Sequence, residues 1–368
     1  MTLLGARALN RATLDRQLLL RRWDLTVPQA LQRLVGLQAQ TPHTWYVGLW
    51  TRLSDYTPEP TAQLLRDAGV VRIALMRATI HLVTAADCRW LRPVLEPVIE
   101  RGMMGSFGRD LLGVDRAELA EVGRELLAAK PLTFSELGRA LAPRWPNHNP
   151  AALAQAVRAS VPLAQVPPRG VWGSSGPAAH TPAETWLGSP MDTEAPVDNL
   201  VLRYLAAFGP ATVRDAQQWC GLTRLAEVTD RLRPRLTVFR DEQGRELFDL
   251  PDASRPDPDT PAPVRFLYDF DNLLLSHADR SRVITVDFAD QGFAGTMEMP
   301  RSVLVDGMVA ATWRVAANRD AATLTVRPFR ELTTAEVEDI TAEGTRLLAF
   351  TAAESRHHDI VLRPPQPG

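Results

Sequence analysis

Two glutamines one residue apart, Gln38 and Gln40, are the side chains whose type and spacing could serve chemistry. They end a segment that begins as a helix, and Pro42 disfavours helical geometry for the residue before it. In an extended chain, side chains two positions apart face the same side, so both amides could converge on one point. An amide is a poor general base, but its oxygen can position a water molecule and direct partial negative charge toward a developing cation. The alternative is a helix C-terminus that ends in polar residues.

Two further segments carry candidate polar side chains. They are Arg77 and His81 in one segment and His277, Asp279 and Arg280 in the other. Arg77 and His81 could face a bound partner, or one of them could be a buried, paired polar group. The second segment could form a polar turn that reaches the same partner. Alternatively, Asp271 and Asp279 cap local turns and Arg280 pairs with a nearby carboxylate.

Length and composition are those of an ordinary globular protein. The 368 residues suffice for two or three domains, with 45% hydrophobic and 23% charged residues. No apolar run approaches the roughly 20 residues that span a bilayer. The N-terminus is polar and lacks the apolar stretch of a secretion signal, so we expect a cytoplasmic protein without a membrane partner.

Charge and cysteine usage exclude several classes of site. Cys88 and Cys220 lack metal-ligand spacing, so we expect no metal or cofactor and two buried thiols. A net charge of −2 argues against a protein that coats nucleic acid, although residues 1–140 carry 18 basic and 14 acidic side chains and could form a local basic surface. Lys130 is the one lysine among the 41 basic residues, so chemistry through a lysine Schiff base is nearly excluded.

An internal repeat indicates how the chain is organised. Residues 25–30, 132–137 and 211–216 share a pattern in which a threonine precedes a short amphipathic helix. The first two are capping boxes, and the third has Asp in place of Glu or Gln. Predicted helices over 116–129 and 198–208 precede the last two, which is the front half of a helix-turn-helix. Three such units at domain-sized spacing predict tandem winged helices.

β-Hairpins should follow as the wings. Residues 161–187 alternate apolar and turn residues around Gly173 and Gly176, which indicates a hairpin. Two strands over 302–305 and 308–314 flank Asp306 and Gly307, a strong signal for a type I′ turn. The stretch 251–263 is rich in Pro and Asp and is typical of a linker or an exposed loop.

Five motif segments together resemble a known family. They are GLQAQ at 36–40, MRATIHLV at 76–83, RYL, FGPAT and WCGL within 203–222, FDNLLLSHADR at 270–280, and LVDG with TWR within 304–314. In this order, spread over residues 10 to 355, they resemble the bacterial winged-helix DNA-binding family that includes AlkZ and YcaQ. Its AlkZ-type members carry a Gln–aliphatic–Gln catalytic motif, and YcaQ-type members have Asp at the last position. The resemblance therefore places Gln38 and Gln40 on the AlkZ side as the catalytic pair.

The resemblance also implies an activity and a partner. It implies a DNA glycosylase that hydrolyses the N-glycosidic bond of N7-alkylguanine in double-stranded DNA, including unhooking of interstrand crosslinks. A role in self-resistance to a DNA-alkylating natural product is a further implication. The residues we expect at the DNA are Arg77, His81, His277, Asp279, Arg280 and Arg314. Without a usable lysine, we expect no lyase activity.

The fold implied is α+β: three tandem winged-helix motifs in a C shape, with a β-rich C-terminal extension. We predict units at 1–115, 116–197 and 198–368, in a monomer because dimerisation heptads are absent. Ala78 and Ala311 stand where the family often has Gly, which is harmless unless the backbone there needs positive φ. Two alternatives remain, a non-catalytic winged-helix DNA-binding regulator and a resistance protein that sequesters the free genotoxin.

Overall fold

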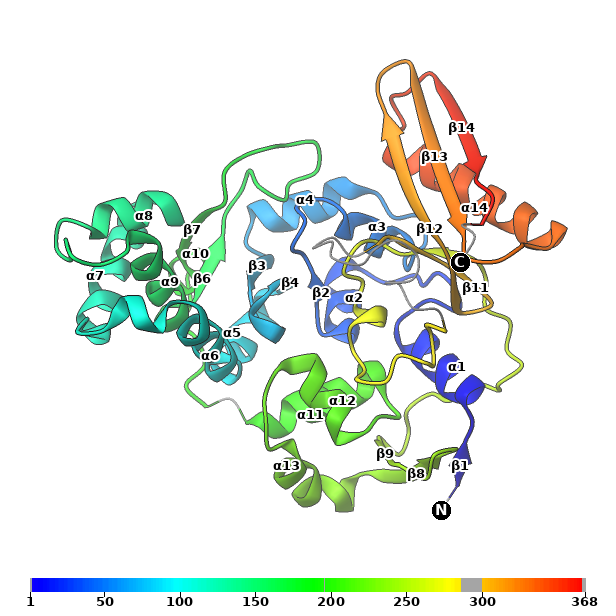
Figure 1. Cartoon of the computed structure of the whole chain (residues 1–368), viewed down its shortest axis with the longest axis horizontal. Coiled ribbons are helices and arrows are strands. Elements are labelled where there is room, and N and C mark those ends of the chain that lie inside the picture. Colours follow the sequence, from blue (N-terminus) through cyan, green and yellow to red (C-terminus); the bar gives the residue numbers. More distant parts are fainter. Residues whose placement is uncertain (1, 195, 286–299, 366–368) are drawn as a thin grey trace.

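Three β-sheets with helices packed around them form a mixed α+β fold (Figure 1). The structure is a computed structural model, and it describes residues 2–194, 196–285 and 300–365. The fold class predicted from the sequence is thus confirmed at the α+β level. Within these ranges no helix combines the length and apolar character that a membrane span requires.

The largest sheet has six strands, and every neighbouring pair is antiparallel. Its spatial order is β2 (Leu37–Gln38), β4 (Ile80–Thr84), β3 (Val70–Ala74), β6 (Leu163–Gln165), β7 (Ala179–Pro182) and β5 (Leu132–Thr133). β2, which carries the first glutamine, is one edge, and β5 is the other. Because strands before and after residue 115 share this sheet, the first two predicted units are joined by one hydrogen-bonded surface.

Two smaller sheets involve the ends of the chain. One contains β1 (Leu3–Leu4), β8 (Thr237–Asp241) and β9 (Glu246–Asp249), with β1 parallel to β8. The other contains β10 (Arg265–Phe266), β11 (Ser302–Val305), β12 (Met308–Ala317), β13 (Ala321–Pro328) and β14 (His357–Leu362). The N-terminal strand is therefore paired with a segment more than 200 residues away, inside the third predicted unit.

Helices account for most of the remaining ordered chain. The α-helices are α1 (Ala6–Arg16), α2 (Val27–Leu34), α3 (Trp45–Trp50), α4 (Pro58–Arg66), α5 (Ala85–Val94), α6 (Glu96–Phe107), α7 (Arg116–Ala129), α8 (Phe134–Leu141), α9 (Pro150–Ser160), α10 (Ala183–Leu187), α11 (Val197–Phe208), α12 (Val213–Cys220), α13 (Leu225–Leu232) and α14 (Thr334–Thr351). Short 3₁₀ turns are η1 (Met76–Ala78), η2 (Gly108–Leu111), η3 (Arg233–Arg235) and η4 (Asn272–Leu274). The helices predicted over 116–129 and 198–208 correspond to α7 and α11.

Capping boxes begin the three helices that the repeat predicts. Thr26, Thr133 and Thr212 each accept a hydrogen bond from the N3 backbone N–H of α2, α8 and α12, and the N3 side chain binds back. Thr333 caps α14 in the same way, a fourth instance that the sequence analysis missed. A further helix and an antiparallel hairpin follow α8 (α9, β6–β7) and α12 (α13, β8–β9). The assignment of three winged-helix units in a C shape, and their boundaries, stay predictions.

Both predicted hairpins are present. β6 pairs with β7 around the loop that contains Gly173. Between β11 and β12, Asp306 and Gly307 have φ values of 46° and 79°. Positive φ at both central positions is what a type I′ turn requires, and Gly takes it without steric cost. Residues 251–263 contain neither helix nor strand, as predicted.

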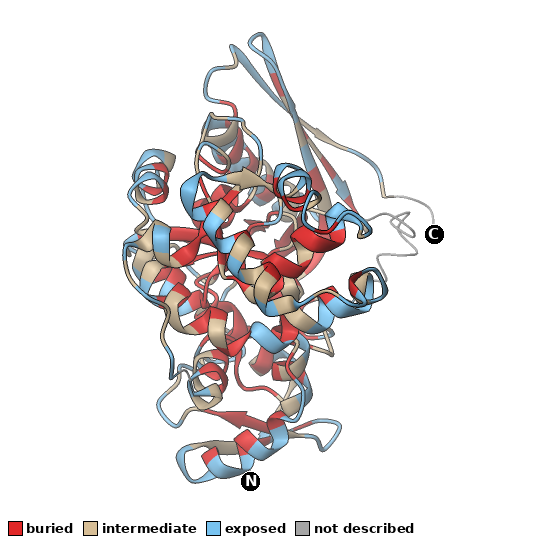
Figure 2. Cartoon of the chain, turned by 90° about the vertical axis from the view of Figure 1, so that its left-hand side faces the viewer, coloured by how far each residue is buried: buried red, intermediate tan, exposed pale blue. Residues whose placement is uncertain are grey.

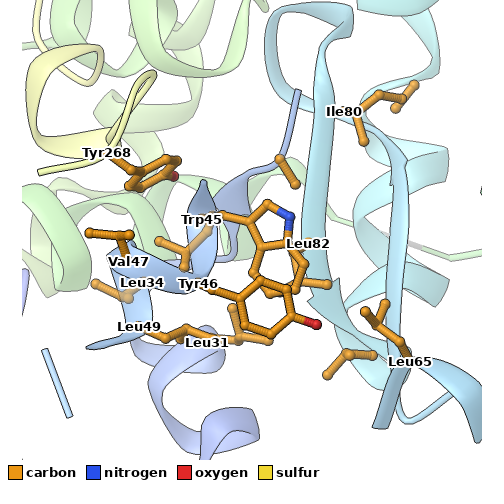
Figure 3. Close-up of a cluster of buried hydrophobic side chains, with 14 of the residues drawn as sticks. Leu31, Leu34, Trp45, Tyr46, Val47, Leu49, Leu65, Ile80, Leu82 and Tyr268 are labelled. Atoms are coloured by element: carbon orange, nitrogen blue, oxygen red, sulfur yellow. The ribbon is translucent and has the colours of Figure 1, made fainter. Parts of the chain in front are cut away.

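A large hydrophobic cluster supports the edge of the sheet at β2. Figure 2 shows the buried segments in the interior and the exposed ones around them. In Figure 3, α2, α3 and β4 contribute Leu31, Leu34, Trp45, Tyr46, Val47, Leu49, Ile80 and Leu82 to this cluster, with Tyr268 from a distant loop. The rings of Trp45 and Tyr46 stack with centroids 3.9 Å apart. Burial of so much apolar surface fixes α2 and β4, and hence the chain between them. Cys88 and Cys220 are buried free thiols, as expected.

Candidate functional site

A sharp change of backbone direction brings the two glutamines out of α2. Val35 ends the helix in the left-handed conformation, and Gly36 follows with φ of +84°. A Cβ on Gly36 would lie 2.8 Å from the carbonyl oxygen of Leu82, so only glycine fits. The chain then runs extended as β2 and pairs with β4, with Gln38 opposite His81. The predicted change from helix to extended chain is thus present, and it occurs before Gln38 rather than at Pro42.

Asn272 binds the outer edge of β2. Its Oδ1 accepts from the backbone N–H of Gln38 at 3.3 Å, and its Nδ2 donates to the carbonyl oxygen of Gly36 at 2.7 Å. A neighbouring strand would make the same pair of bonds, so the side chain of Asn272 replaces a missing strand. Asn272 is buried, and the sequence analysis gave it no role although it lies in the FDNLLLSHADR segment. An asparagine directly before three consecutive leucines was the available signal.

Both glutamine amides bind the turn that connects β3 and β4. The Oε1 of Gln38 accepts from a guanidinium N–H of Arg77 at 2.6 Å, and the Oε1 of Gln40 accepts from the backbone N–H of Ile80 at 3.1 Å. Both partners can only donate, so they fix which end of each amide is oxygen. Within the described part of the chain, neither Nε2 group has a hydrogen-bond partner. Gln38 is 3% exposed, whereas Gln40 is exposed.

The β3–β4 turn has an unusual backbone. Arg77 and Ala78 have φ values of 55° and 58°, two consecutive left-handed residues without glycine. Ala78 stands where the family often has Gly, and this difference matters here because the backbone at position 78 does need positive φ. Ala311, the other such position, has an ordinary strand conformation. A second Arg77 N–H donates to the carbonyl oxygen of Trp219 at 2.6 Å, and Arg158 donates to that of Ala78 at 2.9 Å. These contacts hold the turn against its strain.

The site is electropositive. Burial lowers the pKa of Arg77 to about 10, and the nearby charge of Arg280 adds to this effect. The oxygen acceptors of Arg77 are an amide and a peptide carbonyl, so its charge has no carboxylate partner among the described residues. Arg72, also buried, donates to the carbonyl oxygen of Ala39, between the two glutamines, at 2.8 Å. A negatively charged partner would therefore be attracted to this part of the surface.

Two of the predicted DNA-facing residues are buried instead. His81 is 0% exposed, and burial lowers the pKa of its ring to about 3. His277 is 2% exposed and binds the carbonyl oxygen of Phe208, and its pKa is likewise lowered to about 3 by burial. The prediction that these rings face DNA was wrong for this structure, because they lie inside the protein. For His81 the alternative of a buried polar group describes what is found.

The remaining predicted residues lie at or near the surface. Asp279 caps its own turn through Ser281 N–H, as the alternative interpretation predicted, and pairs with Arg245. Arg280 is half-buried, and its predicted pairing with a carboxylate is not found in the described ranges and stays a prediction. Arg314 is exposed on β12. Contact of Arg280 or Arg314 with DNA stays a prediction.

Other site types find little support in the structure. Nowhere in the described ranges do three or more His, Cys, Asp or Glu side chains gather as metal ligands. The single lysine, Lys130, is exposed at the end of α7 and is separated from β5 by one residue. β5 and β2 are opposite edges of the six-stranded sheet, and five strand spacings of about 4.8 Å put them roughly 24 Å apart. The amine of Lys130 therefore lies far from the glutamines.

Both the sequence and the fold of this chain resemble those of known proteins. A family model described as DNA glycosylase AlkZ-like matches residues 31–350. Among solved structures, the fold is similar to that of the Streptomyces sahachiroi DNA glycosylase AlkZ, with a TM-score of 0.76 and 18% sequence identity over 99% of this chain and 100% of that chain. No curated protein matches the sequence. The family match includes both glutamines, the β3–β4 turn and the Asn272 loop.

Proposed function

Since this chain belongs to the AlkZ-like DNA glycosylase family, we propose that it hydrolyses the N-glycosidic bond of N7-alkylguanine in duplex DNA, with Gln38 and Gln40 at the reacting sugar. The observation that carries the proposal is that one turn holds the oxygens of both amides. The turn thereby brings together two acceptors of fixed orientation, without a carboxylate. The substrate must therefore be one whose hydrolysis two amide oxygens can support without a carboxylate.

N7-alkylguanine is such a substrate because its base is already cationic. A cationic leaving group needs little protonation, so the enzyme has only to position a water molecule beneath C1′ and stabilise an oxocarbenium-like sugar. Each carbonyl oxygen has two lone pairs and uses one of them in the free protein, so each can accept a second hydrogen bond from that water. The water oxygen would then turn its lone pairs toward C1′.

The two glutamines are not equivalent in this scheme. The oxygen of Gln38 is bound by the positive guanidinium of Arg77, which opposes a second positive charge nearby. The oxygen of Gln40 is bound by a neutral backbone N–H, and the residue is exposed. We therefore place the developing sugar cation nearest Gln40 and assign to Gln38 the positioning of the water. The exposure of Gln40 also suits crosslinked guanines, which cannot easily be extruded into a deep pocket.

The position of the single lysine supports a monofunctional reaction. Cleavage of the DNA strand through a Schiff base needs an amine at C1′, and Lys130 lies at the far edge of the sheet. We expect an abasic site as the product. Amine-linked DNA that is trapped by borohydride would contradict this part of the proposal.

Release of free base from defined duplexes tests the function. We expect the protein to release 7-methylguanine from a duplex that contains it, and Gln38→Ala and Gln40→Ala each to lower the single-turnover rate by about 100-fold or more. Gln63→Ala, which changes an exposed glutamine on α4, should keep the full rate. The released base is measured by mass spectrometry. A duplex with an N7-linked interstrand crosslink tests the unhooking activity in the same assay.

Three results would argue against the proposal. Appreciable excision of uracil, a neutral base, would show that the leaving group need not be cationic and would remove the mechanism. Full activity of both glutamine variants would leave a glycosylase with a different site. DNA binding without base release would favour the winged-helix regulator, and protection from the free genotoxin without DNA binding would favour sequestration.

A further inference from the structure

Guanidinium groups that have no carboxylate partner among the described residues surround the β3–β4 turn. Arg158 donates to the carbonyl oxygen of Ala78 at 2.9 Å, and Arg101 donates to that of Gly221 at 3.0 Å. Gly221 lies directly against the turn, because a Cβ on it would be 3.6 Å from the backbone N and Cα of Arg77. Arg280 is close enough for its charge to lower the pKa of Arg77. Four positive charges thus lie around one turn.

Some arginines buried elsewhere are neutralised by carboxylates, whereas others, such as Arg92 and Arg282, donate to neutral oxygens. Arg52 pairs with Asp271 at 2.8 Å and Arg16 with Asp249 at 2.7 Å, and both pairs are buried. Around the turn, in contrast, Glu100 of α6 is directed to Arg116, Asp279 is directed to Arg245, and Asp269 accepts from the Thr41 hydroxyl at 2.6 Å. Neutral carbonyl oxygens orient the turn's guanidinium groups without cancelling their charge. Like charges held together in this way repel one another until an anion binds.

A polyanion with regularly spaced charges fits this arrangement better than a single small anion. The guanidinium groups come from α6, α9, the β3–β4 turn and the loop after His277, so the positive charges are distributed over four separate elements. Burial also lowers the pKa of Arg158 and of Arg280, which an adjacent phosphate would reverse. Duplex DNA offers one phosphate per 3.4 Å along each strand.

We propose that Arg101, Arg158 and Arg280 bind backbone phosphates of the duplex around the nucleotide that the glutamines attack. The inference rests on the proposed function, since it takes DNA as the partner of this site. It adds the phosphate contacts and two residues, Arg101 and Arg158, that no motif in the sequence identified. Arg77 is excluded from the set because it holds Gln38 and its replacement would disturb the chemistry directly.

Salt dependence of binding tests the proposal without requiring catalysis. The full-length protein is titrated with an undamaged fluorescent duplex at a series of KCl concentrations, and the logarithm of the association constant is plotted against the logarithm of salt. The slope is negative, and each lost phosphate contact lowers its magnitude by about 0.9. We expect Arg101→Gln, Arg158→Gln and Arg280→Gln each to do so, and Arg158→Lys and Arg280→Lys to keep the wild-type slope because the charge remains.

Arg240 provides the matched control, since it is exposed and donates to a backbone carbonyl oxygen, that of Gly244, at 2.6 Å. Arg240→Gln should leave the slope unchanged. The proposal is overturned if the three glutamine variants keep the wild-type slope while circular dichroism shows them folded, or if Arg240→Gln lowers it equally. If the arginine variants lower the magnitude of the slope but the wild-type protein releases no base, the phosphate site stands and the proposed function does not. The two proposals can therefore fail separately.

Discussion

At the scale of single residues, the free protein already holds both amides in one orientation. Arg77 and the Ile80 N–H leave each glutamine with its oxygen engaged and its Nε2 group free. A side chain whose orientation is fixed before substrate arrives loses less entropy when it acts. The arrangement therefore raises the question of which end of Gln40 serves the reaction, its oxygen or its NH₂ group.

Gln40→Glu answers that question. It keeps an oxygen that accepts from Ile80 N–H and adds negative charge beside the developing cation, so we expect excision of 7-methylguanine within about tenfold of wild type. Gln40→Leu has nearly the same shape and no acceptor, and it should lose about 100-fold or more. Single-turnover rates with saturating enzyme measure both. Equal inactivity of the two variants would mean that the NH₂ group is the essential end.

At the scale of elements, the β3–β4 turn is the part that assembles the site. It binds Gln38, Gln40, Trp219 and Arg158, although its own backbone is strained. Ala78 is held at φ of 58°, where a residue with a Cβ is disfavoured and glycine is not. The contacts of the turn to the rest of the protein must therefore outweigh this cost.

Ala78→Gly should relieve the strain. We expect the free energy of unfolding to rise by about 0.5–1 kcal/mol, because the relief exceeds the entropy that glycine adds to the unfolded chain. Ala311→Gly is the paired control: it lies in β12 without positive φ, so it should lower stability by about 0.5–1 kcal/mol. Urea denaturation followed by circular dichroism gives both values. Destabilisation by both substitutions would show that the turn is not strained at Ala78.

At the scale of the whole molecule, the loop from Asp271 to Arg282 joins distant parts of the chain. Asp271 pairs with Arg52 of the first predicted unit, and His277 binds the end of α11 in the third. The backbone carbonyl oxygen of Ser276 accepts a hydrogen bond from the Tyr204 hydroxyl at 2.8 Å. The FDNLLLSHADR motif therefore acts largely as a structural connector, and its Asn272 supports the glutamine strand.

Three buried histidines make the whole fold sensitive to mild acid. Burial lowers the pKa of His81 and His277 to about 3 and that of His180 to about 4. Below pH 6.5 the unfolded chain takes up protons that the folded protein refuses, so stability is present above pH 6.5 and falls as the pH falls toward 4. Each histidine contributes about 1.4 kcal/mol per pH unit to this slope.

The measurement is the free energy of unfolding between pH 7 and pH 5, a window above the titration of most carboxylates. His180→Gln should lower the slope by about a quarter to a third, since it removes one of three deeply buried histidines and burial also lowers the pKa of the half-buried His43. His357→Gln, which changes an exposed histidine, should leave the slope as it is. A slope that is flat in the wild type would show that the histidines are not buried as described.

Local interactions explain what could be predicted from the sequence. The capping boxes at Thr26, Thr133 and Thr212 depend on partners three residues away. The Asp306–Gly307 turn depends on two residues that accept positive φ. The extended chain at the glutamines also depends on residues close by in the sequence. The turn at Val35 and Gly36 produces it, and not Pro42 as predicted. Family resemblance then supplied the catalytic assignment, which these local rules could not.

The tertiary structure decided which polar side chains reach the site. Arg77 binds Gln38 from 39 positions away, and Asn272 binds the same strand from 234 positions away. No local sequence pattern distinguishes Arg158, which supports the turn, from the other arginines of the chain. Nor does any local pattern show that the side chain of His81 is buried. Burial and hydrogen-bond partners depend on the packing of segments that are distant in sequence. The sequence by itself thus determined the elements and the family, and the fold determined the environment of each charge.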